Sequence, residues 1–309
     1  AQNLGGTINV KSKLDFVNLQ FPQTATICLG NSLTAYGQVY EPGITNGTSN
    51  PAISSPNIVA EFGYGTSNDP GSFAWSSATF NEPGSNGNND EYSYVFTPGA
   101  AGTYYYSFRY SFNGCDWQYA NEIGVLTVNQ APAITNTYLA INKNNDPSQC
   151  GAVVTYDAAL VTGSPAPTVT YSHASGTVFP VGTTTVTVTA ENTCGKVIKT
   201  FDVTVTDNEN PVLTAGASQN VNLDAGCSIT VPDVRGSATD NCPGTVITQF
   251  PAAGAVVSAS HNGTVNVTVT ATDAAGNKDE AIVVLTAKDV TDPVLTAGAS
   301  QNVNLDAGC

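Results

Sequence analysis

Charged side chains are scarce in this sequence of 309 residues. Asp, Glu, Lys and Arg make up 11% of the chain, whereas a globular domain usually contains about 25%. Nine of them are basic and 24 are acidic, which gives a formal net charge of −15. Nucleic-acid binding needs clusters of Lys and Arg that contact phosphates, so this composition argues against nucleic acid as a partner.

Long apolar runs and familiar catalytic motifs are also missing. No run approaches the roughly 20 apolar residues of a membrane-spanning helix, so no membrane span is expected in this stretch. G-x-S-x-G, a phosphate-binding loop and H-E-x-x-H do not occur, and His173 and His261 lie in polar turns without nearby cysteines. We therefore predict a non-catalytic protein. Methionine is absent and Ala1-Gln2-Asn3 is typical of a terminus left by signal-peptide removal.

Seven cysteines are present, and none forms a C-x-x-C motif. This pattern favours an oxidising compartment over a zinc site, so we expect an exported, extracellular protein of the cell surface. Pairing the cysteines in order along the chain predicts intradomain disulfides Cys28–Cys115, Cys150–Cys194 and Cys227–Cys242. Cys309 is left over, and we expect its partner fifteen residues further on, at the spacing of Cys227 and Cys242.

An internal repeat is the strongest positive signal. Residues 211–227 read PVLTAGASQNVNLDAGC, and residues 293–309 have the same seventeen letters at an offset of 82. Chance does not produce such a match, so the chain contains repeated units. We place boundaries near residues 131 and 209. The predicted domains are 1–130, 131–208, 209–290 and a truncated further copy at 291–309.

Alternating segments predict an all-β fold. In residues 264–272 (TVNVTVTAT), Val or Ala occupies every second position, and Thr or Asn occupies the others. This period of two is typical of a strand with one buried face. An Ala-Gly-Asn turn at 275–277 follows, where positive φ is tolerated. The first 130 residues alternate too, as in GTYYYSFRYSFNG at 102–114, and short Pro-containing junctions between units predict an elongated, semi-rigid rod.

The later units resemble the HYR (hyalin repeat) family, an immunoglobulin-like module of extracellular proteins. The resemblance rests on SATDNCPG at 237–244, TVNVTVTATDAAGNKDEA at 264–281 and Asp-x-x-x-Pro junctions. It is looser for 131–208, where the ATDNC segment is missing and Cys194 stands at the place of the later AAGN turn. The resemblance implies tandem immunoglobulin-like β-sandwiches that serve adhesion or spacing.

The first domain is similar to a module of exported bacterial proteins, through segments such as YGQVYEPGITNG and NNDEYSYVFTPGAAGTYYYSFRY. The order of domains resembles the start of a giant surface adhesin of gliding, type IX-secreting bacteria. This layout implies a role at the bacterial cell surface.

Acidic side chains gather at the two junctions around residues 205–211 and 287–293. Calcium takes roughly six to eight oxygen ligands from carboxylates, amides and carbonyls, so we predict calcium at these junctions. The candidate ligands are Asp207, Glu209, Asp240, Asn241 and Asp273 at the first junction, and Asp289 and Asp292 at the second. The alternative is that these residues only form turns and caps.

Trp75 and Trp117 are candidate carbohydrate-binding residues, because exposed indole rings stack on sugars; core packing is the alternative for each. The favoured function is a non-catalytic extracellular stalk or adhesin segment that spaces and presents binding regions. Its partners would be surface glycans, other surface proteins and further repeats of the same chain. Two alternatives are an accessory module array of a secreted polysaccharide-degrading enzyme and a surface-filament subunit whose strand edges pair between molecules.

Overall fold

The computed structural model describes residues 13–45, 57–81, 88–112, 114 and 116–300. The chain divides into two compact units. The first comprises residues up to 138, 157–173 and 187–200, and the second comprises 139–156, 174–186 and the residues from 201 on. Apart from a 3-10 turn at Pro70–Ser72, all regular structure in these described ranges is strand, which confirms the predicted all-β fold. None of it is a helix long and apolar enough to cross a membrane.

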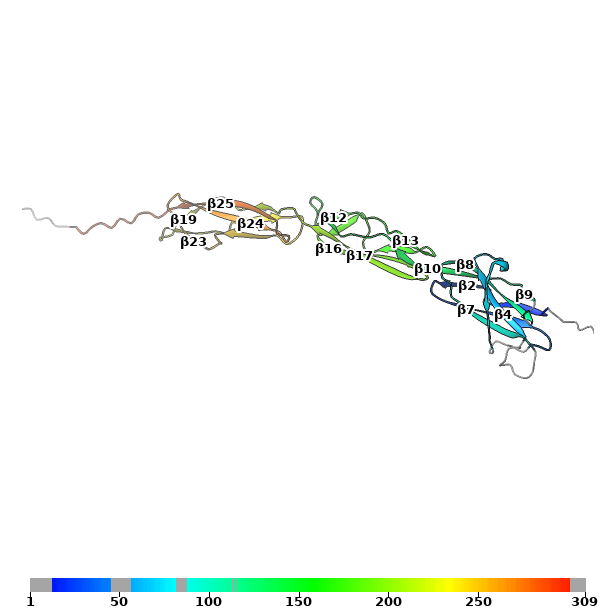
Figure 1. The fold of residues 1–309 in the computed structure, drawn as a ribbon. Helices are drawn as coiled ribbons and strands as arrows, with labels where there is room; N and C mark the ends of the chain where they lie inside the picture. Colours follow the sequence, from blue (N-terminus) through cyan, green and yellow to red (C-terminus); the bar gives the residue numbers. More distant parts are fainter. Residues whose placement is uncertain (1–12, 46–56, 82–87, 113, 115, 301–309) are drawn as a thin grey trace, which may run out of the picture. The chain divides into compact units, whose positions relative to one another are not determined.

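A β-sandwich fills most of the first unit (Figure 1). One sheet has the order β1-β3-β7-β6, and the other has the order β10-β8-β4-β5, with β2 parallel to β10 and β9 beside β8. The strands of the first sheet are β1 (Phe16–Phe21), β3 (Leu33–Tyr40), β6 (Thr79–Phe80) and β7 (Asp90–Phe96). Those of the second are β2 (Thr24–Cys28), β4 (Ile58–Gly65), β5 (Ala74–Ser77), β8 (Gly102–Phe112), β9 (Trp117–Tyr119) and β10 (Gly124–Ile134). This is the ABED and GFC strand order of an immunoglobulin sandwich.

Aromatic rings fill the core of this first sandwich. Tyr106, Phe108 and Tyr110 occupy every second position of β8 and are fully buried. Gly37 of β3 lies against these rings, because a Cβ at this position would meet the Tyr110 hydroxyl and stand 2.7 Å from the Phe108 ring. The missing side chain of Gly37 therefore allows the two sheets to pack around large rings.

Strand β10 continues beyond the first sandwich. Its residues up to Asn129 pair with β2, and Gln130–Ile134 pair with β13 (Val161–Ser164). The side-chain amide of Asn192 donates to the carbonyls of Gln130 (2.8 Å) and Pro165 (3.0 Å) in the same unit. One continuous strand thus leads from the first sandwich into the next region.

The second region repeats the immunoglobulin strand order. A four-stranded sheet has the order β11-β17-β16-β14, with β11 parallel to β17, and β12 pairs with β15. The boundary between the two compact units falls within this region. Its strands are β11 (Ile141–Asn144), β12 (Gly151–Val154), β14 (Thr168–Tyr171), β15 (Thr177–Pro180), β16 (Gly182–Asn192) and β17 (Gly195–Thr206).

The third sandwich lies wholly in the second unit and has the same plan. Its main sheet has the order β19-β25-β24-β22, with β19 parallel to β25, and the pairs β18-β21 and β20-β23 complete it. The strands are β18 (Val212–Thr214), β19 (Gln219–Asn222), β20 (Ser228–Thr230), β21 (Ser237–Thr239), β22 (Val246–Phe250), β23 (Val256–Ser258), β24 (Thr264–Thr272) and β25 (Lys278–Lys288). Val267, Val269 and Ala271 are fully buried, as the alternation in β24 predicts. The chain therefore contains tandem immunoglobulin-like β-sandwiches.

We expect Gly37→Ala to destabilise the first sandwich by about 1–3 kcal/mol, because the added methyl group overpacks the ring core. Gly99→Ala is the matched control: a Cβ at Gly99 has no atom within 4 Å, so its effect should stay within about 0.5 kcal/mol. Both tryptophans belong to this sandwich, so denaturant unfolding followed by tryptophan fluorescence reports on it alone. Equal midpoints for the two variants would contradict the packing described.

Candidate functional site

Four segments of the second unit meet where β17 leads into β18. They are residues 145–150 after β11, 207–211 between β17 and β18, 240–244 between β21 and β22, and 273–277 between β24 and β25. We call them the junction. Direct hydrogen bonds join them: the Asn241 side-chain amide donates to the Gln149 carbonyl (3.1 Å), and the Asn277 amide donates to the Asp207 carbonyl (3.2 Å).

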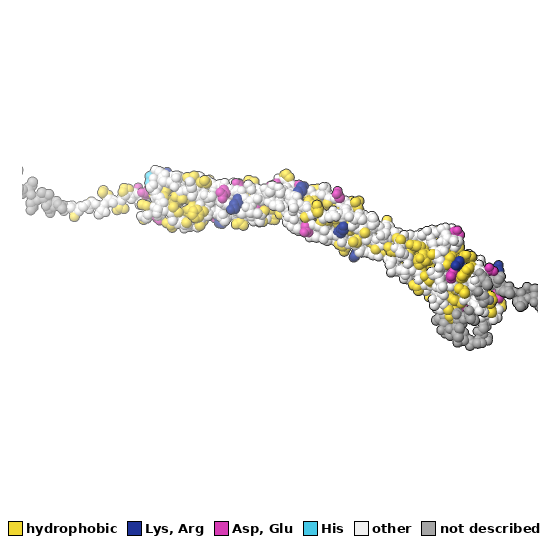
Figure 2. Space-filling view, viewed as in Figure 1, with side chains coloured by type: hydrophobic (Ala, Val, Ile, Leu, Met, Phe, Trp, Pro, Cys, Tyr) yellow, Lys and Arg dark blue, Asp and Glu magenta, His cyan; other side chains and the backbone are white. Residues whose placement is uncertain are grey.

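Three carboxylates converge in the junction. Asp207, Asp240 and Asp273 each place a ligand atom within 4.8 Å of those of the other two. Asp207 and Asp273 are only 4% and 6% exposed, and Asp240 is partly buried. At an effective dielectric constant of about 20, each pair of such charges at this separation repels by about 3.5 kcal/mol or more. Charged side chains cover little of the face seen in Figure 2 and make up only 11% of the chain, so three carboxylates in one cluster are an unusual concentration of negative charge.

Hydrogen bonds hold these carboxylates in place, but one carboxylate oxygen and a neighbouring amide oxygen have no partner. Asp207 Oδ1 accepts from the amides of Glu209 (3.2 Å) and Asn241 (3.3 Å), and Asp240 Oδ2 accepts from the Cys242 N–H (2.9 Å). Asp240 Oδ1 and Asn241 Oδ1 are buried without any hydrogen-bond partner. Buried polar atoms normally find a partner, so an unpartnered carboxylate oxygen of this cluster and an unpartnered amide oxygen next to it are what a cation site would contain.

Asp273 stays ionised at neutral pH. Burial raises its pKa, but hydrogen bonds from the Asn277 side chain and from the backbone N–H groups of Asn277, Gly276 and Ala275 outweigh burial and hold the pKa below its ordinary value. A lowered folded-state pKa means that the ionised form stabilises the fold above the unfolded-state pKa of about 3.9. This contribution is lost as the pH falls through the lowered folded-state pKa.

The donor atoms favour a hard cation. The cluster contains oxygens only, with no His or Cys among its described members, and calcium prefers such ligands, whereas zinc prefers nitrogen and sulfur. Of the other predicted ligands, Glu209 accepts instead from the Ser148 N–H (2.8 Å). Asp289 and Asp292 are exposed and lie outside the cluster.

A disulfide crosses the junction. Cys150, directly before β12, bonds to Cys242 between β21 and β22, with 4.8 Å between the Cα atoms. In the first unit, Cys28 at the end of β2 bonds to Cys194 in the β16–β17 turn, with 5.5 Å between the Cα atoms. Each bond therefore joins one sandwich to the region that follows it.

The predicted intradomain pairing is therefore wrong. Cys28 does not pair with Cys115, which lies outside the described residues. Cys150 does not pair with Cys194, and Cys227 does not pair with Cys242; Cys227 is a free, exposed thiol.

The length of the strands explains the error. Leu223, shortly before Cys227, donates its N–H to the carbonyl of Lys288 at the end of β25 (2.9 Å). Cys242 belongs to the junction, which contains the turn 273–277 at the other end of β25. The 11 residues of β25 span about 35 Å at roughly 3.3 Å each, whereas a disulfide needs Cα atoms within about 7 Å.

The length of a strand also keeps Cys150 too far from Cys194 to form a disulfide. Asn145, in the loop that contains Cys150, donates its N–H to the carbonyl of Thr206 at the end of β17 (2.9 Å). Cys194 directly precedes the first residue of this strand of 12 residues. The sequence carries a signal against pairing within a unit. Cys150 and Cys227 both stand directly before a strand, whereas Cys194 and Cys242 occupy different places in their units.

The two tryptophans lie on the outer face of the first sandwich. The Arg109 guanidinium stacks on both rings, 4.5 Å from the Trp75 centroid and 4.2 Å from the Trp117 centroid. Glu61 pairs with Arg109 at 2.5 Å, and the Trp75 ring covers Gly63. Both rings are partly buried, and Arg109 occupies ring surface that a sugar would need, so carbohydrate binding by Trp75 and Trp117 stays a prediction.

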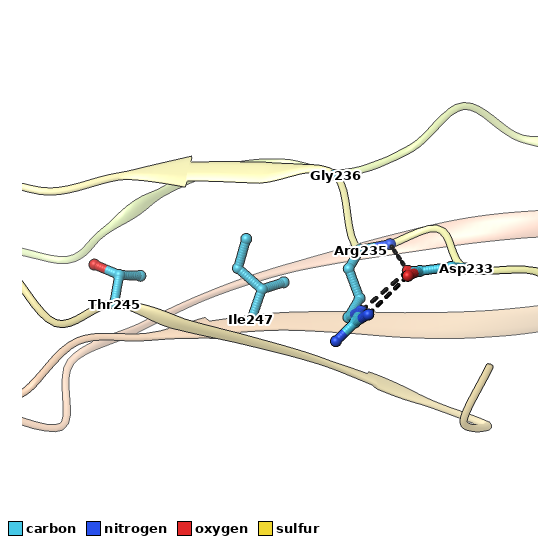
Figure 3. A pocket seen from close by; sticks show the side chains of 5 residues that line it. All are labelled: Asp233, Arg235, Gly236, Thr245 and Ile247. Carbon is cyan, nitrogen blue, oxygen red and sulfur yellow. Dashed lines mark hydrogen bonds and ion pairs between the residues drawn. The ribbon is translucent and has the colours of Figure 1, made fainter.

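An open hollow of about 590 Å³ lies on the third sandwich (Figure 3) and is lined by Asp233, Arg235, Gly236, Thr245 and Ile247. Arg235 binds Asp233 through Nη2 (2.7 Å) and Nε (3.0 Å). The side-chain and backbone hydrogen bonds from Arg235 lower the pKa of Asp233 to about 2. The two charges neutralise each other, so the hollow offers a ligand no unpaired charge among these residues.

No family model and no curated protein matches this chain. Among solved structures, the titin fragment I67–I69 matches at 12% identity and a TM-score of 0.41, covering 89% of this chain and 99% of the fragment. Extracellular domains 3–5 of Drosophila OTK match at 12% identity and a TM-score of 0.30, covering 90% of this chain and 99% of that one. The immunoglobulin-like assignment rests on the strand order of the sandwiches rather than on these distant matches, and HYR membership stays a prediction.

We expect non-reducing peptide mapping to recover Cys28–Cys194 and Cys150–Cys242 links. Trypsin alone leaves Cys150 and Cys194 in one peptide, so a second cut after Glu191 is needed to separate them. Recovery of Cys150–Cys194 or Cys227–Cys242 in the folded, non-denatured protein would contradict the pairing. A map made after denaturation and reoxidation serves as the control for scrambling.

Proposed function

We propose that this chain is a non-catalytic stalk or adhesin segment of the bacterial cell surface, in which consecutive immunoglobulin-like sandwiches are locked by disulfides and by calcium. The observation that carries the proposal is the junction, where Cys150–Cys242 and three convergent carboxylates occupy the same few residues. A flexible string of domains has no need for a covalent and an ionic lock at one place. A spacer that must hold its binding regions away from the surface needs both of these connections.

Several features support an extracellular setting. Disulfides persist in oxidising compartments, and the chain has two of them between described residues. The seventeen-residue repeat is typical of arrays built from one unit. The HYR resemblance and the resemblance to adhesins of gliding, type IX-secreting bacteria agree with a surface stalk.

Calcium fits the junction through its chemistry. Asp207, Asp240 and Asp273 supply carboxylates, and Asp240 Oδ1 and Asn241 Oδ1 are the buried oxygens that lack a partner. A divalent cation would remove the repulsion among the three carboxylates and satisfy these oxygens together. Because Asp207 belongs to one side of the junction and Asp240 and Asp273 to the third sandwich, the ion would stiffen the connection between them.

We expect the full chain, freed of divalent ions, to bind CaCl2 in calorimetry, and its thermal unfolding midpoint to rise with CaCl2 concentration. Asp240→Asn should weaken binding by tenfold or more, because it removes one of the three charges. In chelator, the same variant should be at least as stable as the unaltered chain, since a repelling charge is gone. If Asp240 had a merely structural role, Asp240→Asn would instead lower the stability of the chain both with calcium and in chelator.

Asp292→Asn is the matched control, because Asp292 is exposed and lies outside the cluster. It should leave calcium affinity and the calcium-dependent shift unchanged. Absence of binding heat together with an unchanged midpoint in the unaltered chain would overturn the calcium lock. If Asp240→Asn and Asp292→Asn lowered the affinity for calcium equally, the ion would be bound somewhere other than the cluster.

A further inference from the structure

Cys227 is an exposed free thiol directly before β20 in the third sandwich. It lies at the end of the sandwich opposite the junction, because Leu223 beside it bonds to Lys288, the last residue of β25. The polypeptide leaves the third sandwich at this same end. A cysteine at this place is therefore positioned toward whatever follows residue 288.

Two other cysteines lie at the same end of their sandwiches. In each sandwich an early strand runs parallel to the last strand, as β2 with β10, β11 with β17 and β19 with β25. The residue after the early strand then donates its N–H to a carbonyl of the last strand: Leu29 to Asn129, Asn145 to Thr206, and Leu223 to Lys288. Cys150 and Cys227 stand in the loop that follows, directly before the next strand, and Cys28 is the last residue of β2, where this loop begins.

The first two of these cysteines bond forward along the chain. Cys28 bonds to Cys194 and Cys150 bonds to Cys242, and in both bonds the partner belongs to the next region. After the third sandwich, residues 293–309 repeat residues 211–227 letter for letter. The same offset of 82 places Asp289 at the position of Asp207, since 207 plus 82 is 289. The exit from the third sandwich thus keeps the Asp and the Pro that bound residues 207–211, as Asp289 and Pro293, with three different residues between them.

We propose that Cys227 forms a disulfide with the cysteine equivalent to Cys242 in a further copy of the repeat that follows in the same chain. The inference rests on the proposed tandem stalk and extends it into a ladder, in which each sandwich is bonded to the next. The two thiols lose two protons and two electrons, and a disulfide oxidant such as oxidised glutathione takes them up and becomes two reduced thiols. At the junction between the third sandwich and this further copy, Asp289 would be the carboxylate equivalent to Asp207.

The test extends the full chain. Residues 293–309 already copy 211–227, so appending residues 228–290 after Cys309 completes a second repeat with its own copy of Cys242. After folding in a glutathione redox buffer, non-reducing peptide mapping should link Cys227 to the copied Cys242 and leave Cys309 as a free thiol. The peptides that contain Cys227 and Cys309 differ in their residues before Pro211 and Pro293. The appended copy carries Thr248→Ser, because the tryptic peptide 236–278 would otherwise be identical for Cys242 and its copy.

Two variants of the extended chain provide the controls. Cys227→Ser should free the copied Cys242 and raise the number of reactive thiols by one, whereas Cys309→Ser should lower that number by one. A link between Cys309 and the copied Cys242, or a free Cys227 in the folded extended chain, would overturn the ladder. Neither result would affect the calcium lock at the junction, so failure of this inference is distinguishable from failure of the proposed function.

Discussion

In the second and third sandwiches, the two cysteines lie at opposite ends of strands that are 12 and 11 residues long. A disulfide joins Cα atoms within about 7 Å, and these strands span about 35 Å or more, so the cysteines of one sandwich cannot reach each other. They can reach only the neighbouring sandwich. Because of this constraint, the disulfides connect consecutive sandwiches instead of stabilising a single one. The polar contacts of the junction surround one of these bonds, Cys150–Cys242.

The sparse charge of the chain gives the junction its character. A surface built mainly from Thr, Ser, Asn and Gly has few cations to neutralise a buried acid, and the carboxylates of Asp207, Asp240 and Asp273 are held instead by backbone and amide hydrogen bonds. Such bonds position the oxygens without cancelling their repulsion. The junction therefore combines a covalent bond, a hydrogen-bond network and an uncompensated charge cluster, and a divalent cation would complete it.

Local sequence predicts the strands well and the long-range pairing poorly. The alternation in residues 264–272 identifies the buried face of β24, including Val267 and Val269, and Gly276 adopts the positive φ (96°) expected in the following turn. The meeting of Asp207, Asp240 and Asp273 follows from turns at the same end of the sandwich. The cysteine partners do not follow from spacing, because they depend on which strand end each loop occupies. Glu209 was likewise a plausible ligand by position, but its carboxylate bonds to Ser148.

The central proposal is that the junction fixes residues 139–156 relative to the third sandwich, which belongs to the same compact unit. Spin labels introduced as non-natural amino acids at Val153 and Val246, which are 44% and 61% exposed, lie in the same compact unit and flank the junction. Pulsed electron resonance should give a single narrow distance distribution for the oxidised full chain, and a distribution at least twice as wide when Cys150 and Cys242 are both replaced by serine. A distribution that is equally broad in the intact chain would contradict the account.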